Sequence, residues 1–127
     1  SSGTPGYMSP EILTHQSYDL SSDFFAIGIM IYEFIFGKRP YIGKNRKEIK
    51  EAILAKEVNL KIQDLPDGWS PDVCDLVNKL CKRRSNQRLG KNGISEIKEH
   101  PLFKSIDRHK LYKKEIESPF KPKVNLK

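Results

Sequence analysis

The chain has 127 residues, of which 37% are hydrophobic and 31% charged, with 23 Lys and Arg against 16 Asp and Glu. This length fits one domain, and the apolar fraction suffices for a small core, which argues against wholesale disorder. No apolar run reaches the roughly 20 residues of a membrane span, and no secretory signal is visible. The two cysteines, Cys74 and Cys81, lack zinc-site spacing and suit a reducing compartment, so we expect no metal site and a cytoplasmic location.

The net charge of +7 is concentrated near the end of the chain. Residues 104–127 carry eight Lys and Arg against three acidic residues, which leaves the first 103 residues nearly neutral. A basic tail can bind the phosphates of nucleic acid or of anionic lipid. Apolar residues recur along this tail, from Leu111 to Val124, and favour an extension docked on a protein surface instead. Because no nucleic-acid-binding signature is present, we expect no nucleic-acid partner.

The chain is predicted to open with a loop and a short helix. Residues 1–8 are rich in Ser, Gly, Thr and Pro, which is typical of a loop. Ser9-Pro10-Glu11 then has the form of a helix start: a capping residue, proline at the first helical position and an acid in the first turn. We expect this helix to reach about His15.

A longer helix is predicted from Asp23 to about Phe36. Ser21 or Ser22 can cap its start, and Gly37 ends it. The helix is apolar on almost every side, which predicts a central helix buried all round rather than one with a single apolar face.

Two amphipathic helices are expected next. Residues 46 to about 57 carry apolar side chains on one face and basic ones on the other. A turn at Pro66-Asp67-Gly68 follows, and Ser70-Pro71-Asp72 opens another helix by the same cap, proline and acid pattern. The apolar stripe of that helix consists of Val73, Leu76, Val77, Leu80 and Cys81.

The remaining segment predicts one more short helix, which begins at Ile94 after an Asn92-Gly93 turn and stops before Pro101. No strand pattern appears, so the predicted fold class is mainly α.

No catalytic constellation or glycine-rich phosphate loop is found among these residues. The scattered histidines are predicted to be surface or capping residues; they are His15, His100 and His109.

Five short motifs follow one another along the chain. They are Gly3-Thr4-Pro5-Gly6-Tyr7-Met8-Ser9-Pro10-Glu11, Asp23-Phe24-Phe25-Ala26-Ile27-Gly28, Gly37-Lys38-Arg39-Pro40-Tyr41, Asn86-Gln87-Arg88-Leu89-Gly90 and His100-Pro101-Leu102-Phe103. In this order they resemble blocks of the eukaryotic protein kinases, from the A-P-E end of the activation segment to the close of the domain. Ser9 stands where Ala is usual, and Phe25 stands where Trp is usual.

The tail is similar to the start of the C-terminal extension of AGC-group serine/threonine kinases, the relatives of cyclic-nucleotide-dependent kinase. The resemblance implies the helical C-terminal lobe of the protein-kinase-like fold, incomplete and built round the central helix. It also implies two parts: residues 1–103 as the C-lobe part of the kinase domain and residues 104–127 as the extension.

The resemblance supplies roles for three structural residues. Glu11 and Arg88 would form a buried ion pair, where the alternative is two unrelated surface charges. Asp23 would hold the backbone of the catalytic loop, and it can also stabilise the start of its helix as a first-turn acid.

Further residues would bind the protein substrate. Thr4 resembles the threonine that contacts the catalytic Asp and accompanies Ser/Thr specificity. Pro5 and Met8 would line the pocket for the residue after the target hydroxyl. Glu33 matches an acid that binds a basic residue upstream of the target, or is simply a solvent-facing glutamate. The substrate-binding set implied by the resemblance is Gly3, Thr4, Pro5, Tyr7, Met8 and Glu33, with Gly6 standing where basic-directed relatives often have an acid.

The phosphoryl-transfer motifs themselves are not in these 127 residues: no Gly-rich loop with its Lys, no H-R-D and no D-F-G. We therefore expect no catalytic residue on this chain, and we assign ATP and Mg²⁺ to the complete kinase, with neither bound by this segment alone. The expected partners are a protein substrate and the missing N-terminal part of the kinase. Without that part, we expect exposed apolar faces on the central helix and poor solubility.

Two alternatives stay open. The chain could be a catalytically inactive, kinase-derived module that binds proteins through the substrate face. It could also be a basic binder of nucleic acid or lipid, whose binding would depend on salt and on residues 104–127.

Overall fold

The structure is a computed structural model that describes residues 5–14, 16 and 19–105. Its regular elements are all helical, with no strand among the described residues, which confirms the predicted mainly α fold class. In chain order they are η1 (Pro5–Tyr7), α1 (Pro10–Leu13), α2 (Leu20–Phe36), α3 (Arg46–Ala55), η2 (Ile62–Asp64), α4 (Asp72–Leu80), η3 (Ser85–Gln87), α5 (Ser95–Lys98) and α6 (Pro101–Ser105).

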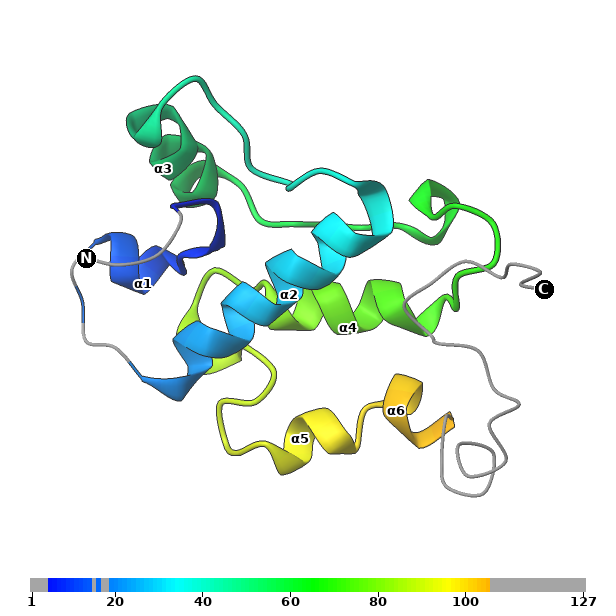
Figure 1. Ribbon diagram of the computed structural model, residues 1–127. Coiled ribbons are helices and arrows are strands. Elements are labelled where there is room, and N and C mark those ends of the chain that lie inside the picture. Colours follow the sequence, from blue (N-terminus) through cyan, green and yellow to red (C-terminus); the bar gives the residue numbers. More distant parts are fainter. Residues whose placement is uncertain (1–4, 15, 17–18, 106–127) are drawn as a thin grey trace.

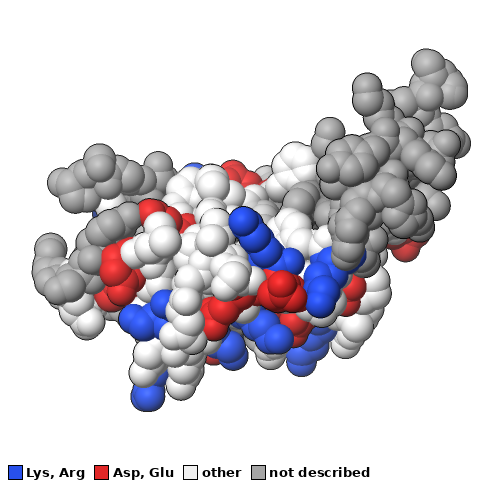
Figure 2. All heavy atoms as spheres, turned by 90° about the horizontal axis from the view of Figure 1, so that it is seen from below, with Lys and Arg blue, Asp and Glu red and all other residues white. Residues whose placement is uncertain are grey.

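Helices α2 and α4 form the centre of the molecule (Figure 1). Helices α1 and α3 lie toward one end of α2, while α6 packs against α4 and α5 lies next to α6. No helix in the described part is both long enough and apolar enough to cross a membrane. From below, basic and acidic side chains are interspersed over the described surface (Figure 2), in keeping with the small net charge of the first 103 residues.

Helix α2 begins earlier than predicted. Its cap is Asp19, whose Oδ1 accepts hydrogen bonds from the backbone N–H of Ser21 at 2.9 Å and from the Ser21 hydroxyl at 2.6 Å. The predicted capping by Ser21 or Ser22 is therefore wrong: both serines lie inside the first turn and are buried. The predicted end is confirmed, because Gly37 adopts φ +77° and its N–H donates to the Glu33 carbonyl.

The predicted burial of α2 on every side is wrong for these residues. One face is buried, but Leu20, Ile27, Met30 and Phe34 are 55%, 38%, 50% and 54% exposed. Their spacing of three, four and seven residues places them along one stripe of the helix. The exposed stripe agrees with the expectation that part of this helix lacks its cover in the chain taken alone.

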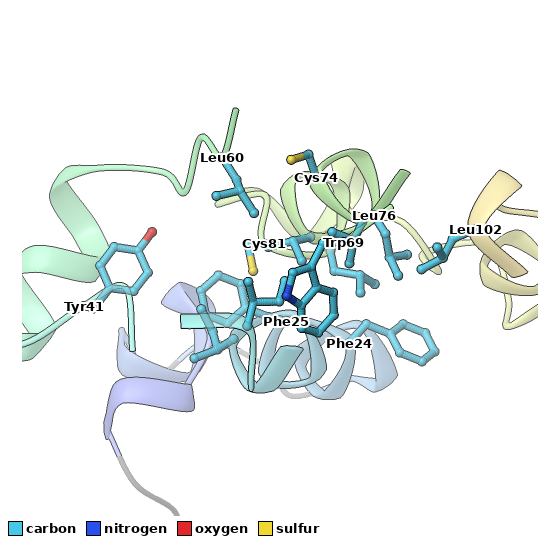
Figure 3. Close-up of a cluster of buried hydrophobic side chains, with 14 of the residues drawn as sticks. Phe24, Phe25, Tyr41, Leu60, Trp69, Cys74, Leu76, Cys81 and Leu102 are labelled. Carbon is cyan, nitrogen blue, oxygen red and sulfur yellow. The ribbon is translucent and has the colours of Figure 1, made fainter. Parts of the chain in front are cut away.

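The core lies between the buried face of α2 and helix α4 (Figure 3). The predicted stripe of α4 is confirmed, since all five of its residues are buried; they are Val73, Leu76, Val77, Leu80 and Cys81. Gly28 lets the two helices approach, because a Cβ there would lie 2.6 Å from Cys81 Sγ. Burial also raises the pKa of the Cys81 thiol, so this side chain stays protonated and packs as a small apolar group.

The other predicted helix bounds need small corrections. Helix α1 ends at Leu13 rather than near His15, which lies outside the described residues. Helix α3 ends two residues before the predicted Glu57 and is capped by the Asn45 side chain. Helix α5 begins at Ser95, next to the predicted start. The connection before α4 contains the short turn η2, which no residue pattern had predicted.

Helix α6 was not predicted as a separate element. It is capped by His100, whose Nδ1 accepts from the Leu102 N–H at 3.1 Å and whose Nε2 lies 2.8 Å from Asp75 Oδ2. His100 is thus a capping histidine, as one of the predicted alternatives stated, but a buried one. His109 and residues 106–127 of the expected extension lie outside the described residues.

Candidate functional site

Tyr7 connects three segments of the chain. Turn η1, which carries it, packs against both α2 and α3. The Tyr7 hydroxyl donates a hydrogen bond to Glu33 Oε1 of α2. The Arg39 guanidinium, three residues beyond the end of α2, lies over the Tyr7 ring with Cζ 4.9 Å from the ring centroid. The hydrogen bond to Glu33, together with burial, raises the pKa of Tyr7 and keeps its hydroxyl protonated as a donor.

Glu33 is a half-buried side chain engaged by the loop, so the alternative of a solvent-facing helix glutamate is not what the structure shows. It is the only acidic side chain between Phe24 and Phe36. Helix α2 fixes its backbone, and the Tyr7 hydrogen bond orients one carboxylate oxygen. The arrangement places an anionic group beside turn η1, for which the resemblance predicts a role in substrate binding.

The next turn of the chain is anchored by Glu11 and Arg88. Arg88 Nη1 lies 2.6 Å from Glu11 Oε2, and Nη2 lies 3.0 Å from Glu11 Oε1, so the pair is bidentate. Both residues are buried. The structure thus brings together two charges that are 77 positions apart in the sequence, and the alternative of unrelated surface charges does not apply.

Every polar group of this pair has a partner. Arg88 also donates to the carbonyls of Lys82, Arg83 and Ser21, at distances from 2.8 to 3.1 Å. The Ser22 hydroxyl donates to Glu11 Oε2 at 2.8 Å. Burial alone would raise the pKa of Glu11, but the hydrogen bonds from Arg88 and Ser22 outweigh it and lower that pKa, so the carboxylate stays ionised.

Phe25 completes the lining of this ion pair. The Arg88 Cζ lies 5.1 Å from the centroid of its ring, within the range of a cation–π contact. The aromatic ring at this position therefore packs in the core and also contacts the buried guanidinium. Sequence reasoning noted Phe25 only as a replacement for Trp, because periodicity shows that a residue is buried but not which charge it faces.

The remaining predicted site residues are only partly described. Asp23 lies in the first turn of α2 and is exposed, and Met8 is half-buried just after η1. Pro5 begins η1, while Gly3 and Thr4 lie outside the described residues. The structure therefore groups Tyr7 and Glu33 at one place and Glu11 and Arg88 at another.

Sequence reasoning missed Arg39 and Ser22 as members of these two groups. Arg39 belongs to a Gly-Lys-Arg-Pro turn, which signals the end of a helix but not the direction of a side chain. Ser22 resembled a helix cap, and that local signal concealed its contact with Glu11 eleven positions earlier.

Comparisons with known proteins agree with the motif order. A family model described as "Protein kinase domain" matches residues 1–103. The chain is 39% identical over 124 residues to "Ribosomal protein S6 kinase alpha-2" of Mus musculus, covering 96% of this chain and 16% of that protein. It is 38% identical over 122 residues to "Ribosomal protein S6 kinase alpha-3" of Homo sapiens, covering 94% and 16%. It is also 39% identical over 122 residues to "Probable serine/threonine-protein kinase pkgA" of Dictyostelium discoideum, covering 96% and 8%. The chain thus spans a small part of the length of each of these relatives.

Proposed function

The chain belongs to the protein kinase family, and from that premise we propose that it is part of a serine/threonine kinase that transfers the γ-phosphate of ATP to protein substrates. It is an AGC-like member of the family, and its helices are those of a C-terminal lobe fragment. In this proposal the segment supplies the substrate-docking loop and a structural core, while the ATP site lies elsewhere in the kinase. Residues 1–103 form the lobe and residues 104–127 begin the extension.

The observation that carries the proposal is the double anchoring of the loop after residue 5. Tyr7 ties the loop to Glu33 of α2, and Glu11 ties the following turn to Arg88. A docking surface must hold its shape before the substrate arrives, because ordering it on binding would weaken the complex. Contacts at both ends of the five-residue stretch from Tyr7 to Glu11 supply that rigidity.

The two anchors suggest a role for each residue of the site. Glu33 binds a basic side chain upstream of the target hydroxyl, and Tyr7 orients its carboxylate. Met8, with Gly3, Thr4 and Pro5, forms the surface for the target residue and the one after it. Asp23, exposed at the start of α2, holds the backbone of a catalytic loop that belongs to the rest of the kinase.

ATP and Mg²⁺ belong to that other part of the protein. The Gly-rich loop with its Lys, the H-R-D loop and the D-F-G Asp are not among these 127 residues. The described residues also contain no group of three His, Cys, Asp or Glu side chains placed to hold a metal ion. In this proposal nucleotide and metal bind to the part of the kinase that carries those motifs, and the whole enzyme is cytoplasmic.

The test begins with the coding sequence around this chain. The transcript is sequenced upstream of the Ser1 codon, and the encoded protein is expressed and incubated with ATP, Mg²⁺ and Ser-containing peptides. We expect the four missing motifs upstream and phosphate transfer that is lost when the H-R-D aspartate is replaced by asparagine. A damaged H-R-D, or a folded protein without transfer, would overturn the enzymatic proposal and support the protein-binding module instead.

A further inference from the structure

Arg39 fills the space in front of Gly6. A Cβ atom built on Gly6 would lie 2.9 Å from Arg39 Nη1 and 3.0 Å from Arg39 Cδ. Among the glycines that the structure describes, those with positive φ are at positions 37, 68, 90 and 93, so the backbone at position 6 does not itself require glycine. The absence of a side chain at this position is what lets Arg39 lie against the loop.

The contact holds the guanidinium in a defined place. Arg39 is half-buried, and its Cζ lies over the Tyr7 ring, 4.9 Å from the ring centroid. Among the residues that the structure describes, no carboxylate lies within the 4.0 Å of an ion pair with it. A guanidinium that lies over an aromatic ring can still donate its N–H groups to a further partner, and their planar fork fits a carboxylate or a phosphate.

Tyr7 therefore lies between two opposite charges. Its hydroxyl binds the Glu33 carboxylate, and its ring carries the Arg39 guanidinium. A peptide that passes this tyrosine would meet an anionic and a cationic group. If Glu33 takes a basic side chain, Arg39 can take an acidic one.

We propose that Arg39 is a specificity-determining residue that binds an acidic or phosphorylated side chain of the protein substrate, next to the basic side chain bound by Glu33. The inference deepens the proposed function and rests on it. It predicts a substrate class with charges of both signs near the target, rather than a purely basic one. Gly6 contributes to this binding site, because the side chain of any larger residue there would displace Arg39.

The test measures peptide binding to the full-length protein that contains these residues. A panel of fluorescent Ser-containing peptides carries Glu, phosphoserine or Gln at one position at a time, and dissociation constants are measured by anisotropy at low salt. We expect one position at which Glu or phosphoserine binds roughly fivefold more tightly than Gln, as for a partly exposed ion pair. Tighter binding of phosphoserine than of Glu would identify phosphate as the preferred group.

Two variants assign the effect to Arg39. Arg39→Leu should remove the preference, whereas Arg84→Leu, which removes an exposed arginine from η3's N-terminal flank, should keep it. Gly6→Glu should also remove the preference although position 39 remains arginine, because the added side chain would displace the guanidinium and its carboxylate would pair with it within the protein. Gly6→Glu keeps the test decisive even if Arg39→Leu lowers the melting temperature.

The outcomes separate the two proposals. A wild-type protein without acidic preference at any position, or a preference that survives both Arg39→Leu and Gly6→Glu, overturns the inference. Phosphate transfer measured on the same panel tests the proposed function independently. Acidic preference without phosphate transfer would leave the binding role of Arg39 standing and remove the enzymatic one.

Discussion

At the scale of single residues, the buried pair of Glu11 and Arg88 differs from the other ion pairs in the described part of the chain. Arg88 has 0% of its side chain exposed, whereas in the Lys91–Asp19 pair the two side chains are 38% and 51% exposed. Water screens the exposed pair and leaves it with little net effect on stability. The buried pair holds a carboxylate that cannot return to water if its partner is removed.

We therefore predict that Arg88→Leu lowers the free energy of unfolding by about 3–5 kcal/mol, because it leaves the Glu11 carboxylate buried and unpaired. Urea unfolding of the full-length protein measures the loss. The matched control is Lys91→Leu, which should change the free energy by less than about 1 kcal/mol. Equal effects of the two substitutions would show that the Arg88 pair is not the anchor described here.

The same pair predicts a dependence of stability on pH. The pKa of Glu11 is lowered from its ordinary value of 4.5 in the folded protein. Its contribution is therefore fully present above that value and is lost as the pH falls through the folded pKa. We expect the free energy of unfolding to decrease more steeply below pH 4.5 in the wild type than in Glu11→Gln. Parallel pH curves for the two proteins would contradict this reading.

At the scale of elements, sequence patterns predicted those features of the helices that depend on residues close to one another along the chain. The stripe of α4 and the end of α2 at Gly37 follow from periodicity and from the glycine cap, and both are confirmed. The start of α2 was misjudged because four of the five residues from Asp19 to Asp23 are Asp or Ser, and each of them can cap a helix. Only the folded structure shows that Asp19 does so.

Contacts between distant elements could not be predicted from local patterns. The link between Glu11 and Arg88 came only from the family resemblance, because nothing in composition joins residues 77 positions apart. The contact of Gly6 with Arg39 was not predicted at all, since it depends on how the turn after α2 folds back.

The close approach of α2 and α4 gives a prediction at this scale. Gly28→Ala should destabilise the protein by about 1–3 kcal/mol, because the added Cβ would lie 2.6 Å from Cys81 Sγ and 2.9 Å from Leu80 Cβ. The measurement is the shift in the urea unfolding midpoint. Adding Cys81→Ala should restore part of the loss by removing the nearer clash. An unchanged midpoint for Gly28→Ala would mean that the helices pack less closely than described.

At the scale of the whole molecule, the exposed stripe of α2 is the main feature without a cover among the described residues. Leu20, Ile27, Met30 and Phe34 are all more than a third exposed on one face. Large apolar side chains gathered on one face are a hazard for aggregation unless another surface covers them. In the proposed kinase, that cover is the part of the domain outside this chain.

We predict that residues 1–127 expressed alone aggregate, and that the double substitution Met30→Gln and Phe34→Gln increases the soluble fraction. Static light scattering across a concentration series measures the effect. The control is Ile62→Gln, a residue 61% exposed in η2 rather than on α2, which should change little. A cooperative thermal transition of the unmodified chain at high concentration, without scattering, would contradict the prediction.

The sequence separation of Glu11 and Arg88 has a consequence for biosynthesis. A ribosome adds roughly 5–20 residues per second, so the 77 positions between them take about 4–15 s to make. Throughout that interval the nascent docking loop lacks the second of its two anchors, and the Glu11 carboxylate must remain hydrated. The loop that would bind substrates is therefore among the last parts of the lobe to be fixed, which delays a working docking surface until translation of the lobe is nearly complete.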